Sequence, residues 1–441
     1  MSILWQEYKH ILRSRFLWIV AVLGLSICVY IASMSCYYFG DGDVSMPYRF
    51  TEEHGTSFTQ NDAEIYMKYY MANTKEGKRI QQDFEQAGLE NVTAEEIKAY
   101  YNGEPTKLGK KLQEISSGEM SEAEEQAYWN IIACMERLYT PFVIVENNNA
   151  EKINIEEWKE SWLETGGENF PKWKQDLILS GYDHLAERTE EIVKNKENHQ
   201  MLPILSNFSQ NSHWFQFQFS STSALGFLWG LALVLAGIAA ARSLGGSLMG
   251  NMQSIAYTGK KGRTLVLYKL LAVLIVCAVL YLAFYLLITV LYLFLFRLDL
   301  YWDVPLASMV SYSGSVIPRF PITVGGYWWF QLGVGLGAVL IMALIFSAAM
   351  IFTKSFYAGS AISVGVSLLL LGLVQMVPAV QNSFLLMGSP IGLFLQAGKF
   401  LQQEFLFSIL PHFEGVMLLI WGGIAAILTT VGFVRFRRAA L

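Results

Sequence analysis

Apolar residues are gathered into six long stretches that contain no Lys, Arg, Asp or Glu. Four of them lie at 16–40, 270–296, 320–353 and 415–434, and two longer ones lie at 198–241 and 355–398. A helix needs about 20 apolar residues to cross the hydrocarbon core. The first long stretch begins with polar residues, and the second is interrupted at Pro378. Each of the six is therefore predicted to supply one membrane-spanning helix.

The segment that follows the fifth predicted span, 379–412, holds an apolar run that is too short to cross the membrane again. Its apolar run of about 15 residues contains Pro390 and is shorter than a spanning helix. Backbone that enters the membrane without crossing it must be covered by protein. The segment is therefore re-entrant or interfacial, and we expect a re-entrant hairpin that enters and leaves on the outer side.

Composition and charge place the chain in a membrane and orient it. Hydrophobic residues make up 53% of the chain and charged residues only 16%, which is typical of membrane proteins. Lys and Arg concentrate in the segments that are cytoplasmic if the N-terminus is inside, whereas the short outside loops hold only Arg297, Arg319 and Lys399. By the positive-inside rule, we predict a multi-pass protein of the cell membrane with both termini in the cytoplasm.

The first 15 residues are predicted to form an amphipathic helix on the inner membrane face, ahead of a first span at 16–36. Leu4, Tyr8, Ile11 and Leu12 share one face of this helix. The residues expected to anchor it at the headgroups are Trp5, Lys9, Arg13 and Arg15. We interpret the first span as a retained anchor, because "IASMSCYYFGDGD" offers only a weak signal-peptide cleavage site.

Residues 37–218 are predicted to form an extracellular domain, followed by spans two to six in 219–441. The domain is acidic, and helix-type patterns such as "TAEEIKAYY" dominate it, whereas "TPFVIVENNNAEKINI" favours some strand. Its acidic residues could gather a cationic peptide, or they could simply solvate exposed helices. Cys36 and Cys134 both fall outside the membrane, and their pairing stays open. The predicted fold class is thus an α-helical integral membrane protein with six spans, a mainly helical outer domain and a re-entrant hairpin.

Most enzyme chemistry is absent from the sequence. There is no G-x-x-x-x-G-K-[ST] phosphate loop, because Lys260 is followed by Lys261, and there is no H-E-x-x-H motif. The four cysteines show no zinc spacing. We therefore expect no catalytic residue, no metal or cofactor bound by this chain, and no nucleic-acid partner.

The predicted spans carry no ionisable residue near their centres, unlike ion-driven transporters, which usually use such groups. Three amides lie at membrane depth instead, namely Gln331, Gln375 and Gln396. They are candidates for contacts along a transport pathway, although hydrogen bonds between helices are a more common use of such residues.

The predicted cytoplasmic loop at 242–265 ends in a basic turn, "TGKKGR". These basic residues could serve only to fix the topology, or they could contact anionic lipid headgroups. The order of features in this loop, however, resembles the permease subunits of ABC exporters of the type-two family. A hydrophobic pair and a turn at 254–259 are followed by Gly262-Arg263 and then by Lys269 at the start of the third span. The stretch "GGSLMGNMQS" lacks the Glu residues that many relatives carry in the short helix of this loop.

Two further stretches support this resemblance, which covers 1–36 and 220–441. They are the opening "ILWQEYKHILRSRFLWIV" and the outer "LLMGSPIGLFLQAGKFL". The resemblance implies that the loop docks on an ATPase. The residues it places at that contact are Asn251, Gln253, Tyr257, Lys260, Lys261 and Arg263.

By the same resemblance, the chain is a permease that moves an amphipathic cargo outward, either a peptide, an antibiotic or a lipid. It implies two copies of a separate ATPase subunit, which would bind ATP and Mg²⁺, and a second permease copy or paralogue. Membrane lipid is a further expected partner. The alternative is a membrane-anchored sensor or scaffold whose extracellular domain binds a peptide.

Overall fold

The computed structural model describes residues 3–38, 45–86, 89, 92–117, 125, 128–129, 131–133, 135–136, 139, 142, 145, 150–200, 223–245, 264–309, 317–376, 383–395, 397 and 407–438. Over these residues the chain is helical and contains no β-strand. Two isolated β-bridges, Ser57 with Gln200 and Pro305 with Thr323, join segments that are distant in sequence.

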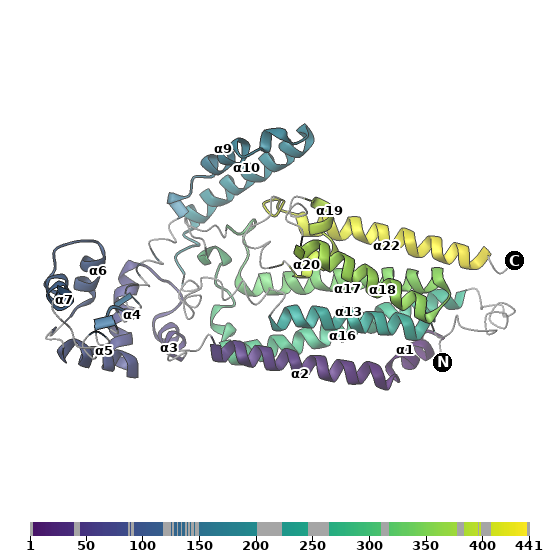
Figure 1. Cartoon of the computed structure of the whole chain (residues 1–441), viewed down its shortest axis with the longest axis horizontal. Coiled ribbons are helices and arrows are strands. Elements are labelled where there is room, and N and C mark those ends of the chain that lie inside the picture. Colours follow the sequence, from purple (N-terminus) through teal and green to yellow (C-terminus); the bar gives the residue numbers. More distant parts are fainter. Residues whose placement is uncertain are drawn as a thin grey trace.

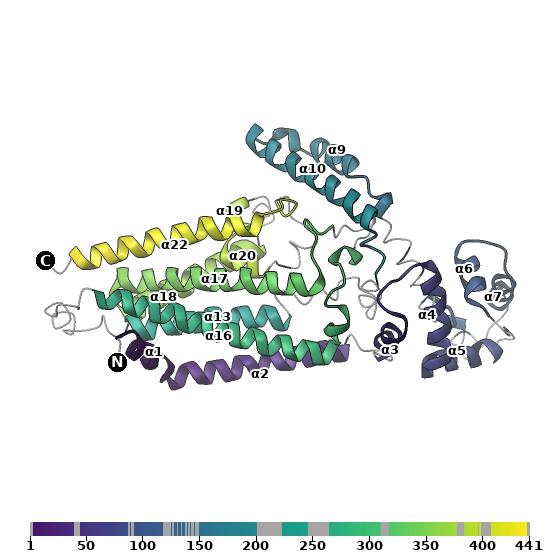
Figure 2. The same cartoon turned by 180° about the vertical axis from the view of Figure 1, so that it is seen from behind.

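Six helices are long and apolar enough to cross a membrane, as the charge-free stretches predict. They are α2 (Arg15–Tyr38), α13 (Ala224–Ala240), α16 (Leu265–Phe296), α17 (Val324–Thr353), α18 (Phe356–Met376) and α22 (Phe413–Arg438). They run side by side in one bundle (Figures 1 and 2). A π-helical turn, η3 (Ala241–Gly245), extends α13.

The two ends of the bundle differ. Both chain termini and the first helix, α1 (Ile3–Leu12), lie at one end, which we name the terminal end (Figure 1). The helices of residues 45–200, the inserted domain, lie alongside and beyond the opposite end, named the domain end. They are α3 (Ser45–His54), α4 (Gln60–Asn73), α5 (Lys75–Gln86), α6 (Ala94–Tyr101), α7 (Lys107–Ser117), η1 (Ala150–Lys152), α9 (Ile155–Glu164), η2 (Gly167–Asn169) and α10 (Lys172–Asn195).

The strand expected in "TPFVIVENNNAEKINI" is wrong for the residues that the structure describes there. Phe142 and Val145 are helical, and residues 150–152 form the 3-10 turn η1. Tyr139 and Phe142 stack with ring centroids 5.9 Å apart. Because Tyr139, Phe142 and Val145 are spaced three apart, a helix turns them toward one side, and this packing outweighs the strand preference of a short apolar run.

Short elements join the spanning helices at the domain end. Between α16 and α17 lie η5 (Leu298–Tyr301) and η6 (Leu306–Met309); between α18 and α22 lie α19 (Phe384–Met387) and α20 (Pro390–Leu395). The last two helices have four and six residues, far fewer than a crossing needs. They lie near the domain end, where α18 ends and α22 begins (Figure 1).

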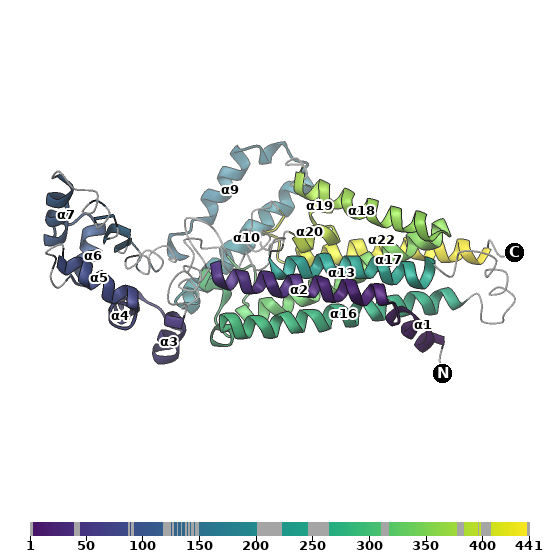
Figure 3. The same cartoon turned by 60° about the horizontal axis from the view of Figure 1, so that its bottom comes forward.

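The bundle has a central pair of helices and a looser periphery. In α13 and α17, 67% and 72% of the span is buried, against 22% in each of α2, α18 and α22. Figure 3 shows α18 along one edge of the bundle and α16 along the other. Hydroxyl N-caps begin both central helices, because Ser223 accepts a hydrogen bond from the Gly226 amide and Thr323 accepts one from the Gly326 amide.

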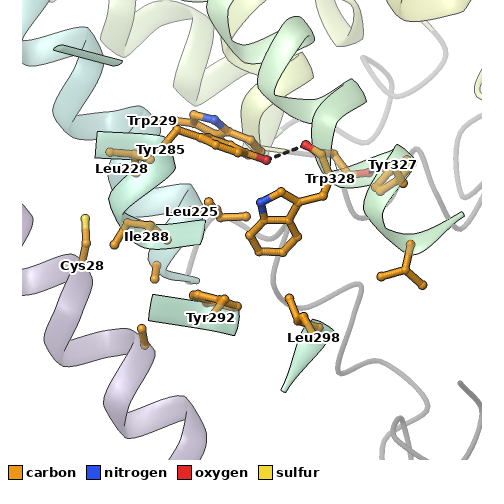
Figure 4. Packing of buried hydrophobic residues seen from close by; sticks show 14 of the residues in the cluster. Cys28, Leu225, Leu228, Trp229, Tyr285, Ile288, Tyr292, Leu298, Tyr327 and Trp328 are labelled. Carbon is orange, nitrogen blue, oxygen red and sulfur yellow. Dashed lines mark hydrogen bonds between the residues drawn. The ribbon is translucent and has the colours of Figure 1, made fainter. Parts of the chain in front are cut away.

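Aromatic side chains hold α13, α16 and α17 together (Figure 4). The Trp229 indole donates to the Tyr281 hydroxyl at 3.2 Å, and the Tyr285 hydroxyl donates to the Trp328 carbonyl at 2.8 Å. The Trp328 indole donates to Thr289 at 2.8 Å. Buried Tyr and Trp need such partners for their polar ends, so the cluster fixes how the three helices face one another.

One glycine makes this packing possible. A β-carbon at Gly335 of α17 would lie 2.0 Å from the Tyr281 hydroxyl oxygen and 3.1 Å from the Trp229 indole nitrogen. These two side chains belong to the hydrogen-bonded pair that joins α13 to α16. Gly335 therefore lets α17 approach the aromatic cluster closely.

A buried ion pair closes the domain end. The Arg319 guanidinium, just before α17, contacts the Glu414 carboxylate at the start of α22 and donates to the Leu410 carbonyl at 2.9 Å. Arg319 is 5% exposed and Glu414 is 2% exposed. The pair satisfies both charges and joins two segments that lie 95 residues apart in the sequence.

Helix α10 of the inserted domain lies across this pair. His184 hydrogen-bonds to the Arg319 carbonyl at 2.7 Å, and Arg188 donates to the Pro318 carbonyl at 3.3 Å. Glu197 forms an ion pair with Arg188.

Gly181 of α10 allows close contact with the segment before α22, because a β-carbon there would lie 2.7 Å from the Ile409 side chain. The inserted domain is thereby fixed to the segments that precede α17 and α22.

The change Glu414→Gln should destabilise the protein strongly, because it leaves the Arg319 charge buried without a counter-ion. Breaking one side of a buried pair costs about 3–5 kcal/mol. As a matched control, Glu52→Gln removes a carboxylate that contacts Arg297 at 2.9 Å, but these two side chains are 48% and 40% exposed. Exposed pairs contribute about 0–1 kcal/mol.

Thermal unfolding of the purified variants measures the difference. The double change Arg319→Met with Glu414→Leu should be less harmful than Glu414→Gln alone, since it removes both charges. Equal losses for Glu414→Gln and Glu52→Gln would contradict a structural role of the buried pair.

Candidate functional site

A half-open cavity of about 670 Å³ lies between helices of the bundle, in the half nearest the terminal end. It is lined by the start of α2, the second half of α13 with η3, the last turns of α17 and the first half of α18. This volume lies within the range of small-molecule pockets, roughly 300–1,000 Å³. The cavity is the candidate functional site.

Most of the cavity wall is apolar. The side chains that line it include Leu233, Val234 and Ile238 of α13, Phe346 and Met350 of α17, and Phe356, Val364 and Leu368 of α18. A wall of this kind accepts hydrocarbon, because apolar surface gains by leaving water.

Two glycines of α13 leave room for the cavity. Gly230 and Gly237 are seven residues apart and therefore lie on the same side of the helix; both line the cavity. A β-carbon at Gly230 would meet no atom within 4 Å, and one at Gly237 would meet only the Phe346 ring at 4.0 Å. Larger side chains at these two positions would fill the cavity.

The polar lining consists of hydroxyls and one cation. Ser360, Ser363 and Ser367 of α18 lie along one helix face. Ser363 donates to the Gly359 carbonyl at 2.8 Å and Ser367 to the Ser363 carbonyl at 2.9 Å, so these two donors are satisfied within α18. Arg242, in η3, is at the terminal end of the cavity.

Arg242 is charged and has no ion-pair partner among the described residues, whereas Lys269 next to it in the bundle does. The Lys269 ammonium contacts the Glu7 carboxylate of α1 at 2.8 Å. Burial lowers the pKa of His10 on α1, and the positive charge of Arg242 lowers it further. The Glu7 carboxylate raises the pKa of His10 and partly offsets this effect.

Helix α18, which carries the serines, is a peripheral wall. Its principal neighbours are α17, η3, α19 and α20. Leu368, which lines the cavity, and Leu369, which does not, are each 61% exposed. Other lining residues, among them Phe16, Val234 and Val364, are exposed too. The cavity is therefore open on one side, and in a membrane this opening faces lipid.

The predicted anchoring residues lie on or beside α1. Trp5 stacks on Tyr8 with ring centroids 5.3 Å apart, and the Lys9 ammonium lies 5.0 Å from the centroid of the Trp5 ring. Arg13 and Arg15 are exposed. The apolar face of α1 packs against α16, and its Ile11 is fully buried. Helix α1 is therefore part of the bundle as well as a surface helix.

The six residues proposed for the ATPase contact, Asn251, Gln253, Tyr257, Lys260, Lys261 and Arg263, lie outside the described residues, as does Gln396. Gln375 belongs to α18. Gln331 is 2% exposed, and its amide nitrogen donates to the Tyr327 hydroxyl at 2.7 Å. It does not line the cavity.

The polar residues of the cavity were not singled out in the sequence analysis, nor was Glu7, the ion-pair partner of Lys269. Glu7 is the only acidic residue in 1–36, which could have suggested a partner for a nearby cation. The spacing of Ser360, Ser363 and Ser367 at i, i+3 and i+7 within an apolar helix could have indicated a polar stripe. The isolation of Arg242 had no signal, because it depends on where carboxylates lie in space.

The described residues contain no group of three His, Cys, Asp or Glu that could hold a metal ion. Comparison of the chain with protein-family models, with curated proteins and with solved structures finds no match. The fold and the cavity are therefore the features from which a function is inferred.

Proposed function

We propose that the chain is the permease subunit of an ATP-driven ABC exporter, working with a second permease copy or paralogue and two ATPase subunits. The observation that carries this proposal is the cavity of about 670 Å³ within the spanning helices. Its apolar wall and single cation suit an amphipathic cargo. The resemblance of the 242–265 loop to type-two permeases supports the same function.

The proposal also assigns an energy source. In the described spans, Lys, Arg, Asp and Glu lie only near the ends, so no mid-membrane ionisable group is available to couple an ion gradient. These residues are Arg15, Arg242, Lys269, Glu414, Arg435, Arg437 and Arg438. The residues 246–263 connect η3, which carries Arg242, to α16. A force applied there by an ATPase would act on one wall of the cavity and, through Lys269 and Glu7, on α1.

In this proposal the terminal end is cytoplasmic and the inserted domain is extracellular. Cysteine labelling tests the orientation after replacement of the native cysteines. Trp173→Cys on α10, where the tryptophan is 66% exposed, and His412→Cys at the start of α22 should react with a membrane-impermeant maleimide added to intact cells.

Lys354→Cys and Arg438→Cys, both at the terminal end, should react only after permeabilisation. Labelling of His412→Cys only after permeabilisation would place 383–412 across the membrane and contradict the re-entrant arrangement. Labelling of Arg438→Cys in intact cells would reverse the proposed orientation.

Co-purification tests the ATPase partnership. The tagged chain should retain an ABC ATPase subunit, and reversal of Lys260, Lys261 and Arg263 to Glu should reduce that retention several-fold while membrane insertion stays normal. The control reverses Arg435 and Arg438 at the C-terminal end of α22, which carry cationic charge at the same end of the bundle.

Loss of the ATPase with the control but not with the loop variant would contradict docking through the loop. Retention of no ATPase by the unmodified chain would favour the membrane-anchored sensor.

A further inference from the structure

The length of the cavity fits one leaflet of a bilayer. Along α13 the lining runs from Gly230 to Arg242, which is about 18 Å at 1.5 Å per residue. Half of the hydrocarbon core is about 15 Å thick. Ser14 and Phe16, at the junction of α1 and α2, also line the cavity, so its cationic end is level with the interfacial helix α1.

The charge in the cavity wall indicates that the polar end of the ligand is anionic. Among the described residues that line the cavity, Arg242 is the only charged one, and none is Asp or Glu. Arg242 is exposed at the end of the cavity, and Arg binds phosphate through several N–H donors. A cationic peptide, one candidate partner of the acidic inserted domain, does not fit this site.

We infer that the cavity binds an anionic phospholipid taken from the leaflet at the terminal end, with its phosphate on Arg242 and its acyl chains along α13 and α18. Binding of the lipid does not depend on the proposed function; only its later transport across the membrane does. The open side of the cavity, where the lining residues Phe16, Val234 and Val364 are exposed, gives the lipid a lateral route.

The binding is tested on the full chain without any ATPase, so that its failure is distinct from failure of the proposed function. The protein is placed in nanodiscs of equal parts phosphatidylglycerol and phosphatidylcholine, and the lipid retained on gentle release is counted by native mass spectrometry. The unmodified chain should retain phosphatidylglycerol about tenfold better, as one charge-assisted contact implies.

Two variants with matched controls locate the site. Arg242→Gln should abolish the preference for phosphatidylglycerol, whereas Arg435→Gln, which removes an exposed cation at the same end of the bundle, should keep it. Gly230→Leu should reduce retention of both lipids by filling the cavity. Gly333→Leu on α17 should not, although neither glycine has an atom within 4 Å of an added β-carbon.

Several results would overturn the inference. Equal effects of Arg242→Gln and Arg435→Gln would show only a general attraction of the surface for anionic lipid. Unchanged retention by Gly230→Leu would place the lipid outside the cavity. Displacement of the bound lipid by millimolar inorganic phosphate would show a phosphate site that does not need acyl chains.

Discussion

The arrangement of the helices depends on where buried ion pairs can lie in a membrane protein. Charge in the hydrocarbon core is expensive, and the described spans place their buried ion pairs at the two ends. Arg319 and Glu414 join the approaches to α17 and α22 at the domain end. Lys269 and Glu7 join α16 to α1 at the terminal end. Between these ends, aromatic hydrogen bonds and apolar packing hold the helices together.

The ion pairs and the aromatic hydrogen bonds connect some helices of the bundle firmly and leave others with fewer attachments. Helices α13, α16 and α17 share the aromatic cluster, and α10 of the inserted domain bridges the starts of α17 and α22. Helix α18 has neither kind of attachment among the described residues. It packs mainly on α17 and lines one side of the half-open cavity. A helix held this way can move without breaking a buried charge pair, which suits the wall of a transport route.

Six spanning helices could be predicted from the sequence, because hydrophobic length and the absence of charge are local properties of the chain. The strand expected near Phe142 failed because a short apolar run fits a helix or a strand equally well until its packing partners are known. The ion pair of Arg319 with Glu414 links residues 95 positions apart, and no pattern in the sequence indicates it. The cavity was equally hidden, since it arises where Gly230 and Gly237 face α18 across the bundle.

Locking the cavity while transport is measured would show whether the cavity is the route of the cargo. Val234→Cys on α13 and Val364→Cys on α18, both lining residues, are joined by a cleavable thiol cross-linker in a chain without its native cysteines. The chain is reconstituted in phosphatidylglycerol vesicles with the ATPase that co-purifies with it. ATP-driven movement of a fluorescent phosphatidylglycerol between leaflets should stop on cross-linking and return on reduction, while each single-cysteine chain stays active. Full transport by the cross-linked protein would contradict the cavity as the route.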